Sequence, residues 1–174
     1  AAIGFTIYPG SDMALDMFEE IVAMRKEAAA KGVATVIWSY PRGEAITKDG
    51  ETAIDIAAYA AQIAALIGAH VIKIKLSTDH LMLPEAKKVY EDKKIDIATQ
   101  AKRVEHCMQA AFAGRRIVVF SGGAAKGADA VYDDARAIRD GGGNGSIIGR
   151  NSFQRSREDA LEMLGKLVDI YKGA

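Results

Sequence analysis

The run VIKIKLS, residues 71–77, is short, rich in β-branched residues and apolar enough to predict a buried strand. It also carries lysines at two alternate positions, Lys73 and Lys75. Because strand side chains alternate between the two faces of a sheet, both ammonium groups point to the same face. One strand thus combines the apolar character of a core with a pair of like charges.

On both sides of this run, short β-rich segments alternate with longer helical ones. The predicted strands cover 2–8, 34–40, 70–76, 116–122 and 145–149, and the predicted helices cover 11–32, 52–68, 96–114, 130–142 and 156–171. Several helical segments have apolar residues at helical spacing, begin near Ser, Thr or Asp and end at Gly. Near-continuous apolar strands separated by helices predict right-handed β/α units and a parallel sheet covered by helices.

Five β/α units fit two architectures. A doubly wound α/β sheet can be complete with five strands, whereas a closed (β/α)8 barrel needs eight strands and typically about 250 residues. The chain has 174 residues and no internal repeat beyond the β/α rhythm, which suits one domain with a sizeable core. The residues alone leave both architectures open.

The segment 77–96, STDHLMLPEAKKVYEDKKID, is longer and more polar than a usual loop between a strand and a helix. We expect it to be a lid or an insertion near the functional site.

The charge balance excludes several classes of partner. The 23 basic and 23 acidic residues give no net charge and form no basic run, so we expect neither nucleic acid nor an anionic membrane surface as a partner. No apolar stretch is long enough to span a bilayer and the first residues show no signal peptide, so we expect a cytoplasmic protein.

Metal and thiol chemistry are not indicated. The single cysteine, Cys107, lies in a helical pattern and is expected to be an inert thiol, and no Cys/His cluster has zinc-ligand spacing. His70, His80 and His106 are scattered along the chain and are expected to be structural. We therefore expect no metal site.

The two lysines of the central run suggest covalent chemistry. A lysine that points into a site of low dielectric loses hydration, and a second ammonium two residues away repels it, so both effects favour the neutral amine. A neutral amine is what a Schiff-base nucleophile needs to attack a ketone near neutral pH. The structural alternative is that Lys73 and Lys75 line a wet sheet edge or bond acidic neighbours.

The motif WSYPRG, residues 38–43, ends the second predicted strand, where Pro41 stops the ladder and Gly43 permits a turn. Trp38 and Tyr40 share one face of that strand. A phenol there can move protons on a hydroxyl or a carbinolamine, and an indole can shape a sugar pocket. The alternative is that both aromatic rings simply fill the core.

The last two predicted strands end in glycine-containing exits, FSGGAAKGAD at 120–129 and IIGRNSFQ at 147–154. Small residues let backbone N–H groups approach an anion, and Arg150 can bind two phosphate oxygens at once. The loops after the last two strands of a (β/α)8 barrel often form such a site. A lone SGG is commonly a simple turn, but the pair of exits predicts phosphate binding.

Five motifs follow one another along the chain: FTIYPGS (5–11), WSYPRG (38–43), VIKIK (71–75), FSGG (120–123) and IIGRN (147–151). Their order and spacing resemble the archaeal-type class I fructose-bisphosphate aldolases over essentially the whole chain, and the longer segment after Lys75 looks like the bacterial branch of that family. The resemblance implies a (β/α)8 TIM barrel whose lysine forms a Schiff base with dihydroxyacetone phosphate, without a metal or other cofactor.

The resemblance also implies roles for individual residues. The Schiff-base lysine matches Lys73, with Lys75 as the neighbour that helps to keep it uncharged. Tyr40 matches the proton-transfer tyrosine and Trp38 the pocket aromatic beside it. The phosphate-binding positions of the seventh and eighth strands match Ser121, Gly122, Gly123, Gly149 and Arg150.

By the same match, residue 1 falls at the start of the family's fourth strand. The range 1–174 would then be a partial barrel domain of strands four to eight, without the first three β/α units and the catalytic aspartate of the first strand. Five barrel strands leave two open edges and an uncovered interior, which is unfavourable in water. We therefore expect this chain alone to have little activity and to associate, since members of the family form homo-oligomers.

The resemblance implies reversible cleavage of fructose 1,6-bisphosphate to dihydroxyacetone phosphate and glyceraldehyde 3-phosphate, as in glycolysis and gluconeogenesis. Two alternatives stay open. One is a related lysine-dependent aldolase or transaldolase that acts on another phosphorylated sugar. The other is a non-catalytic phosphate-binding β/α module, which would bind phosphate ligands without covalent chemistry.

Overall fold

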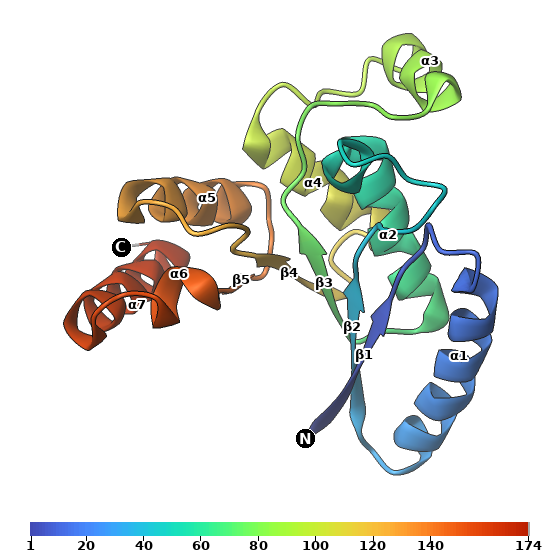
Figure 1. Ribbon diagram of the computed structural model, residues 1–174, viewed down its shortest axis with the longest axis horizontal. Helices are drawn as coiled ribbons and strands as arrows, with labels where there is room; N and C mark the ends of the chain where they lie inside the picture. The colour runs from blue at the N-terminus through green and yellow to red at the C-terminus, as the bar shows by residue number, and fades with distance from the viewer. Residues whose placement is uncertain (174) are drawn as a thin grey trace.

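The computed structural model describes residues 1–173, which contain a five-stranded parallel sheet (Figure 1). The strands are β1 (Ala2–Ile7), β2 (Ala34–Ser39), β3 (Val71–Lys75), β4 (Ile117–Ser121) and β5 (Ser146–Ile147). Each lies within a predicted strand. The largest difference is at 145–149, where only two residues pair with the neighbouring strand.

The helices that connect the strands also follow the prediction. The five long helices are α1 (Ala14–Ala30), α2 (Ile54–Ile67), α4 (Gln100–Ala110), α5 (Ala128–Asp140) and α7 (Arg157–Lys172). The described residues also contain three short elements that the pattern did not predict: the 3-10 helix η1 (Gly50–Thr52), α3 (Pro84–Asp92) and α6 (Arg150–Phe153).

Side-chain capping marks two of the helix starts. The hydroxyl of Thr99 accepts the backbone N–H of Lys102, and the hydroxyl of Ser156 accepts that of Asp159. Helix α2 ends at Gly68, whose φ of 101° lies in the left-handed region that favours glycine. Ser156 and Gly68 are the start and stop that the sequence indicated, whereas the cap of α4, Thr99, lies three residues after the predicted start at Asp96.

The order of the strands decides between the two architectures. The sheet runs β1-β2-β3-β4-β5, and each strand pairs in parallel with the next one along the chain. A doubly wound sheet reverses its strand order at a switch point, and the five described strands contain no such reversal. Right-handed crossovers that all run in one direction place successive helices on the same face of the sheet. A doubly wound sheet has helices on both faces, so the strand order excludes that alternative for the described strands.

The main core lies between the sheet and these helices. Ile37, Ile72, Ile74 and Phe120 are at most 1% exposed and form one cluster with the alanines of α2. Full burial of such a side chain contributes about 1.5–3 kcal/mol to the free energy of unfolding. The small alanine side chains let α2 approach the central strand closely.

A second, smaller cluster joins α5 to α7 through Val131, Tyr132, Met163, Leu167 and Ile170. It lies at the end of the sheet where β5 is only two residues long. In Figure 1 these two helices form the orange and red group beside β4 and β5.

The opposite face of the sheet carries the predicted site residues. The register places Trp38 beside Lys73 and Lys75 beside Ser121. It then places Ser121 beside Ile147 of β5. Predicted site residues from three separate motifs, and Ile147 of a fourth motif, therefore lie in adjacent positions near the carboxyl ends of the strands.

The segment 77–96 is partly helical and is fixed to the start of α2. The buried carboxylate of Asp55 accepts the backbone N–H groups of Met82 at 3.1 Å and Leu83 at 2.9 Å. Helix α3 follows directly and has no buried residues. Figure 1 shows it at the periphery, beyond the ends of α2 and α4.

Candidate active site

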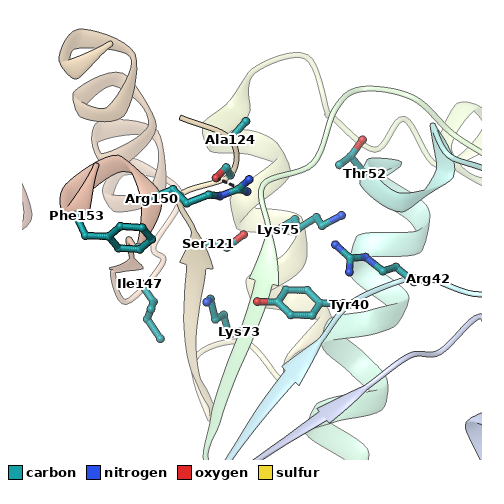
Figure 2. Close-up of a pocket in the computed structure, with 13 residues that line it drawn as sticks. Tyr40, Arg42, Thr52, Lys73, Lys75, Ser121, Ala124, Ile147, Arg150 and Phe153 are labelled. Atoms are coloured by element: carbon teal, nitrogen blue, oxygen red, sulfur yellow. Dashed lines mark hydrogen bonds between the residues drawn. The ribbon is translucent and has the colours of Figure 1, made fainter. Parts of the chain in front are cut away.

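A cavity of about 530 Å³ lies on the face of the sheet that carries the lysines, which is a typical size for a small-molecule site. It is lined by Tyr40, Arg42, Thr52, Lys73, Lys75, Ser121, Gly122, Gly123, Ala124, Ile147, Gly149, Arg150 and Phe153 (Figure 2). The lining includes every predicted site residue except Trp38. Residues from five chain segments thus meet at the carboxyl ends of the strands.

Lys73 is the deeper of the two lysines and comes two residues before the end of β3. It is half-buried, and its ammonium makes no hydrogen bond or ion pair with any residue in 1–173. In Figure 2 the hydroxyl of Tyr40 is turned toward Lys73. An amine without an ionic partner, beside a phenol in a cavity, can serve as a nucleophile.

Lys75 differs from Lys73 because it has a carboxylate partner. Its Nζ lies 2.7 Å from Oε2 of Glu51, whose other oxygen lies 3.0 Å from Nζ of Lys48. Nε of Arg42 lies 3.5 Å from Glu51 Oε2. The hydrogen bonds from Lys75 and Lys48 lower the pKa of Glu51 to about 2, so its carboxylate stays ionised at neutral pH.

The pairing with Glu51 modifies the predicted role of Lys75. The structural alternative, an ammonium bonded to an acidic neighbour, describes Lys75 but not Lys73. Because Glu51 compensates much of the positive charge of Lys75, the repulsion between the two lysines is weaker than their spacing alone suggests. Glu51 was missed by sequence reasoning, although the connection between β2 and α2, in which it lies, is a usual place for functional residues.

Tyr40 is held at the exit of β2, where its backbone N–H donates to the carbonyl of Ile7 at 3.0 Å. The guanidinium of Arg42 lies 5.6 Å from the centre of the Tyr40 ring, within the range of a cation–π contact. These contacts fix the phenol at one wall of the cavity (Figure 2).

Trp38 lies outside the cavity lining. Its indole packs over Gly4 of β1, where an added Cβ atom would come within 2.1 Å of the ring. The absence of a side chain at Gly4 gives the indole a flat surface on the neighbouring strand. Trp38 therefore flanks the cavity on the side of β1 and does not form its wall.

The two glycine-containing exits are joined to each other. The N–H of Gly122 donates to the carbonyl of Ile147 at 3.3 Å, and Nη2 of Arg150 donates to the carbonyl of Gly123 at 3.0 Å. Gly123 has a φ of 67°, a conformation that glycine adopts without strain. The arrangement brings an arginine and small backbone units to one end of the cavity, where they can bind an anion.

Asn151 is a site residue that sequence reasoning missed. It is 2% exposed and makes three hydrogen bonds to the loop after β4, from Nδ2 to the carbonyls of Gly122 (2.9 Å) and Ala124 (3.0 Å), and from the N–H of Lys126 to Oδ1 (2.8 Å). The IIGRN motif contains it, but only the fold shows which loop it binds.

Other reactive groups lie away from the cavity. Burial raises the pKa of the Cys107 thiol to about 12, in keeping with an inert side chain. Nδ1 of His70 accepts the N–H of Thr35, and Nε2 of His106 bonds the hydroxyl of Tyr90 at 2.6 Å. None of the three histidines lines the cavity.

No residue of the segment 77–96 lines this cavity, and only Ser77 and Thr78 reach the adjoining one, so the segment is placed as an insertion near the site and not as a lid over it. Its residues instead line a separate apolar cavity against α2 and α4. Within residues 1–173, no group of three or more His, Cys, Asp or Glu side chains is placed to hold a metal ion. No helix among these residues is long and apolar enough to cross a membrane.

A parallel β/α sheet with lysines at the carboxyl ends of its strands is an arrangement that Schiff-base aldolases use. The chain matches the family model of DeoC/LacD family aldolases over residues 1–155 and belongs to that family.

Relatives confirm the resemblance to class I fructose-bisphosphate aldolases. The chain is 33% identical to the class 1 fructose-bisphosphate aldolase of Thermoproteus tenax over 174 residues, which cover 99% of this chain and 56% of that protein. It is similar to the crystal structure of an archaeal fructose 1,6-bisphosphate aldolase, with a TM-score of 0.79 and 32% identity, over 99% of this chain and 58% of that chain.

A second similar structure shows an archaeal fructose-1,6-bisphosphate aldolase with its catalytic lysine covalently bound to the carbinolamine intermediate of the substrate. The TM-score is 0.78 and the identity 31%, over 98% of this chain and 57% of that chain. The chain thus spans a little over half the length of the relatives that it matches.

Proposed function

We propose that the chain is a Schiff-base aldolase domain that reversibly cleaves fructose 1,6-bisphosphate to dihydroxyacetone phosphate and glyceraldehyde 3-phosphate. The observation that carries the proposal is the difference between the two lysines of β3. Lys75 is paired with Glu51, whereas Lys73 has no ionic partner among the described residues and lies in the cavity with Tyr40. The relatives named class 1 fructose-bisphosphate aldolase support the substrate.

In this proposal the amine of Lys73 attacks the ketose carbonyl and forms a carbon–nitrogen bond. Loss of water from the carbinolamine gives an iminium ion. The C4 hydroxyl proton then passes to a base and the C3–C4 bond breaks, so that C4 leaves as the aldehyde of glyceraldehyde 3-phosphate and the bonding electrons pass into the iminium to give an enamine. Protonation of the enamine and hydrolysis release dihydroxyacetone phosphate and restore the free amine.

Tyr40 is proposed to move protons at the carbinolamine, because its hydroxyl is turned toward Lys73 in the cavity (Figure 2). Lys75, held at the rim by Glu51, is proposed to be the electrostatic neighbour of Lys73, with much of its charge compensated by that carboxylate. Trp38 is proposed to support the wall from outside, packed on Gly4.

The phosphate of the substrate is proposed to bind where the two glycine-containing exits meet. The positions are Ser121, Gly122, Gly123, Gly149 and Arg150, all of which line the cavity. Their binding energy would fix the ketose carbonyl within reach of the lysine, which lowers the entropic cost of the attack.

The domain over residues 1–174 is proposed to form strands four to eight of a (β/α)8 TIM barrel. The sequential strand order supports this assignment, and so does the share of 56–58% that the chain covers in its relatives. Strands β1 and β5 end the described sheet on either side, so further β/α units would be needed to close the barrel. We expect the chain alone to have little activity and the complete protein to be a homo-oligomer.

The test, made on the complete protein, is borohydride reduction in the presence of dihydroxyacetone phosphate, followed by turnover measurements with a panel of ketose phosphates. A reducible adduct and a preference for fructose 1,6-bisphosphate are expected. An adduct with a clear preference for another phosphorylated sugar would replace the substrate but keep the mechanism. Phosphate binding without any adduct would contradict the aldolase proposal and favour the phosphate-binding module.

A further inference from the structure

The loop after β4, residues 122–126, is held by one buried side chain from the other exit. Asn151 uses its whole amide for this purpose. Both hydrogens of Nδ2 donate to loop carbonyls, those of Gly122 and Ala124, and Oδ1 accepts the N–H of Lys126. A side-chain amide has two donors and an acceptor, so Asn151 uses each kind of group in contacts to this loop.

These contacts also set the direction of the backbone N–H groups. In a trans peptide the C=O and the following N–H point in opposite directions. Because the carbonyls of Gly122 and Ala124 point to Asn151, the N–H groups of Gly123 and Ala125 point away from it. Neither N–H has an acceptor within residues 1–173.

Both of these N–H groups belong to residues that line a cavity. Gly123 lines the site cavity, and Ala125 lines an adjoining cavity of about 320 Å³ that shares Lys75 and Ser121 with it. Free N–H groups of a loop beside a cationic side chain can together bind an anion, and here they belong to the alternate residues Gly123 and Ala125. Phosphate binding would therefore depend on the orientation of this loop.

Asn151 is itself fixed by Arg155. Nε of Arg155 donates to the carbonyl of Asn151 at 2.7 Å, and Nη2 donates to the carbonyl of Lys126 at 2.7 Å. Arg155 therefore bonds both Asn151 and the end of the loop that Asn151 binds. Loop 122–126, Asn151 and Arg155 thus form one hydrogen-bonded unit in the absence of a ligand.

We infer that Asn151 is a positioning residue for phosphate: it holds loop 122–126 in the orientation that presents its free N–H groups to the phosphate of the substrate. The inference rests on the proposed function for the identity of the ligand. A preorganised loop binds more tightly because no ordering cost is paid on binding. Asn151 acts through the loop and touches no reacting atom.

The test compares two variants with a matched control. Asn151→Ala removes all three hydrogen bonds. Asn151→Asp keeps the volume but replaces the donor with an oxygen that faces two carbonyls. Asn144→Ala is the control, because Oδ1 of Asn144 also accepts a buried backbone N–H, that of Val118 at 2.8 Å, at the opposite end of β4.

Isothermal titration gives the dissociation constants of inorganic phosphate and of dihydroxyacetone phosphate for each protein. We expect Asn151→Ala to weaken both by about 10-fold and Asn151→Asp by more, while Asn144→Ala leaves both unchanged. Unchanged constants in a folded Asn151→Ala or Asn151→Asp variant would overturn the inference. An equal loss in Asn144→Ala would also overturn it, because the effect would then be one of general stability.

A second measurement separates this inference from the proposed function. Borohydride trapping with unphosphorylated dihydroxyacetone should be the same in wild type and Asn151→Ala, whereas the concentration of dihydroxyacetone phosphate needed for half-maximal trapping should rise about 10-fold. If Asn151→Ala weakened trapping equally with dihydroxyacetone and with dihydroxyacetone phosphate, the inference would be overturned. A wild-type protein that binds phosphate but forms no adduct would contradict the aldolase proposal and leave the role of Asn151 to be decided by the phosphate constants.

Discussion

The two faces of the sheet differ in composition and in partners. The face toward the helices carries Ile37, Ile74 and Phe120, which are at most 1% exposed and contact apolar side chains. The other face carries Lys73 and Lys75 on alternate residues of the same strand and borders the cavity. Because side chains alternate along a strand, the five residues of β3 contribute apolar side chains to the core on one face and lysines to the cavity on the other.

This separation leads to opposite expectations for substitutions on the two faces. Changes on the cavity face should alter adduct formation or phosphate binding and leave the free energy of unfolding nearly unchanged. Changes on the helix-covered face should do the reverse.

In the complete protein, Lys73→Met should abolish the reducible adduct and lower the turnover of fructose 1,6-bisphosphate by at least about 1,000-fold, because the nucleophile is lost. The free energy of unfolding measured in urea should change by less than about 0.5 kcal/mol, since the side chain makes no ionic contact among the described residues. Lys75→Met is the control and should still form the adduct. Unchanged trapping in Lys73→Met would refute the assignment.

Phe120→Ala, on the covered face, should lower the free energy of unfolding by about 3–5 kcal/mol because it leaves a cavity among buried side chains. Urea denaturation monitored by circular dichroism measures the change. Ile147→Ala, at 43% exposure on the cavity side, is the matched control and should cost much less. Equal losses in the two variants would contradict the division between the faces.

Arg150→Ala should weaken the binding of inorganic phosphate by about 10- to 100-fold, the loss expected for a charge-assisted hydrogen bond to an anion. Titration calorimetry at constant ionic strength gives the two dissociation constants. Arg116→Ala serves as the control, because Arg116 contacts Phe112 away from the cavity. An unchanged phosphate constant in Arg150→Ala would place the anion elsewhere.

Glu51→Gln should lower the free energy of unfolding by about 1 kcal/mol at neutral pH, the scale of partly exposed ion pairs. The folded protein lowers the pKa of Glu51 from 4.5 to about 2, so its stabilising effect is present above pH 4.5 and is lost as the pH falls toward 2. Unfolding measured between pH 2 and 5 should therefore depend less on pH in Glu51→Gln. If the free energy of unfolding changed equally steeply with pH in wild type and Glu51→Gln, the result would argue against this ion pair.

Ile117→Thr should change the free energy of unfolding by less than about 0.5 kcal/mol, because Ile117 lies at 50% exposure on the uncovered face. Val118→Thr, one residue later and fully buried, is the matched comparison and should cost considerably more. A large effect of Ile117→Thr would show that this face is covered in the protein as it exists in solution.

The sequence predicted the strands and long helices well because their signals are local. Apolar runs, capping residues and glycine stops lie within each element, and the alternation in VIKIK places Lys73 and Lys75 on one face. Helix α3 was not predicted because PEAKKVYED is short and mostly polar and buries no residue. Strand β5 was predicted too long because only Ser146–Ile147 meet β4.

The parts of the site that sequence reasoning missed depend on contacts between distant segments. Glu51 reaches Lys75 across 24 positions, and Asn151 reaches the loop after β4 across 25 to 29 positions. The position of Trp38 depends on a glycine in another strand. No local pattern encodes such pairings, because they follow from the register and topology of the sheet.

The most direct test of the central claim is to treat the protein with dihydroxyacetone phosphate and borohydride, record its intact mass and map the modified peptide. The account predicts one reduced adduct, on Lys73. An adduct on Lys75 would contradict the distinction drawn between the free lysine and the lysine paired with Glu51, and a protein that binds phosphate yet forms no adduct would contradict the Schiff-base mechanism itself.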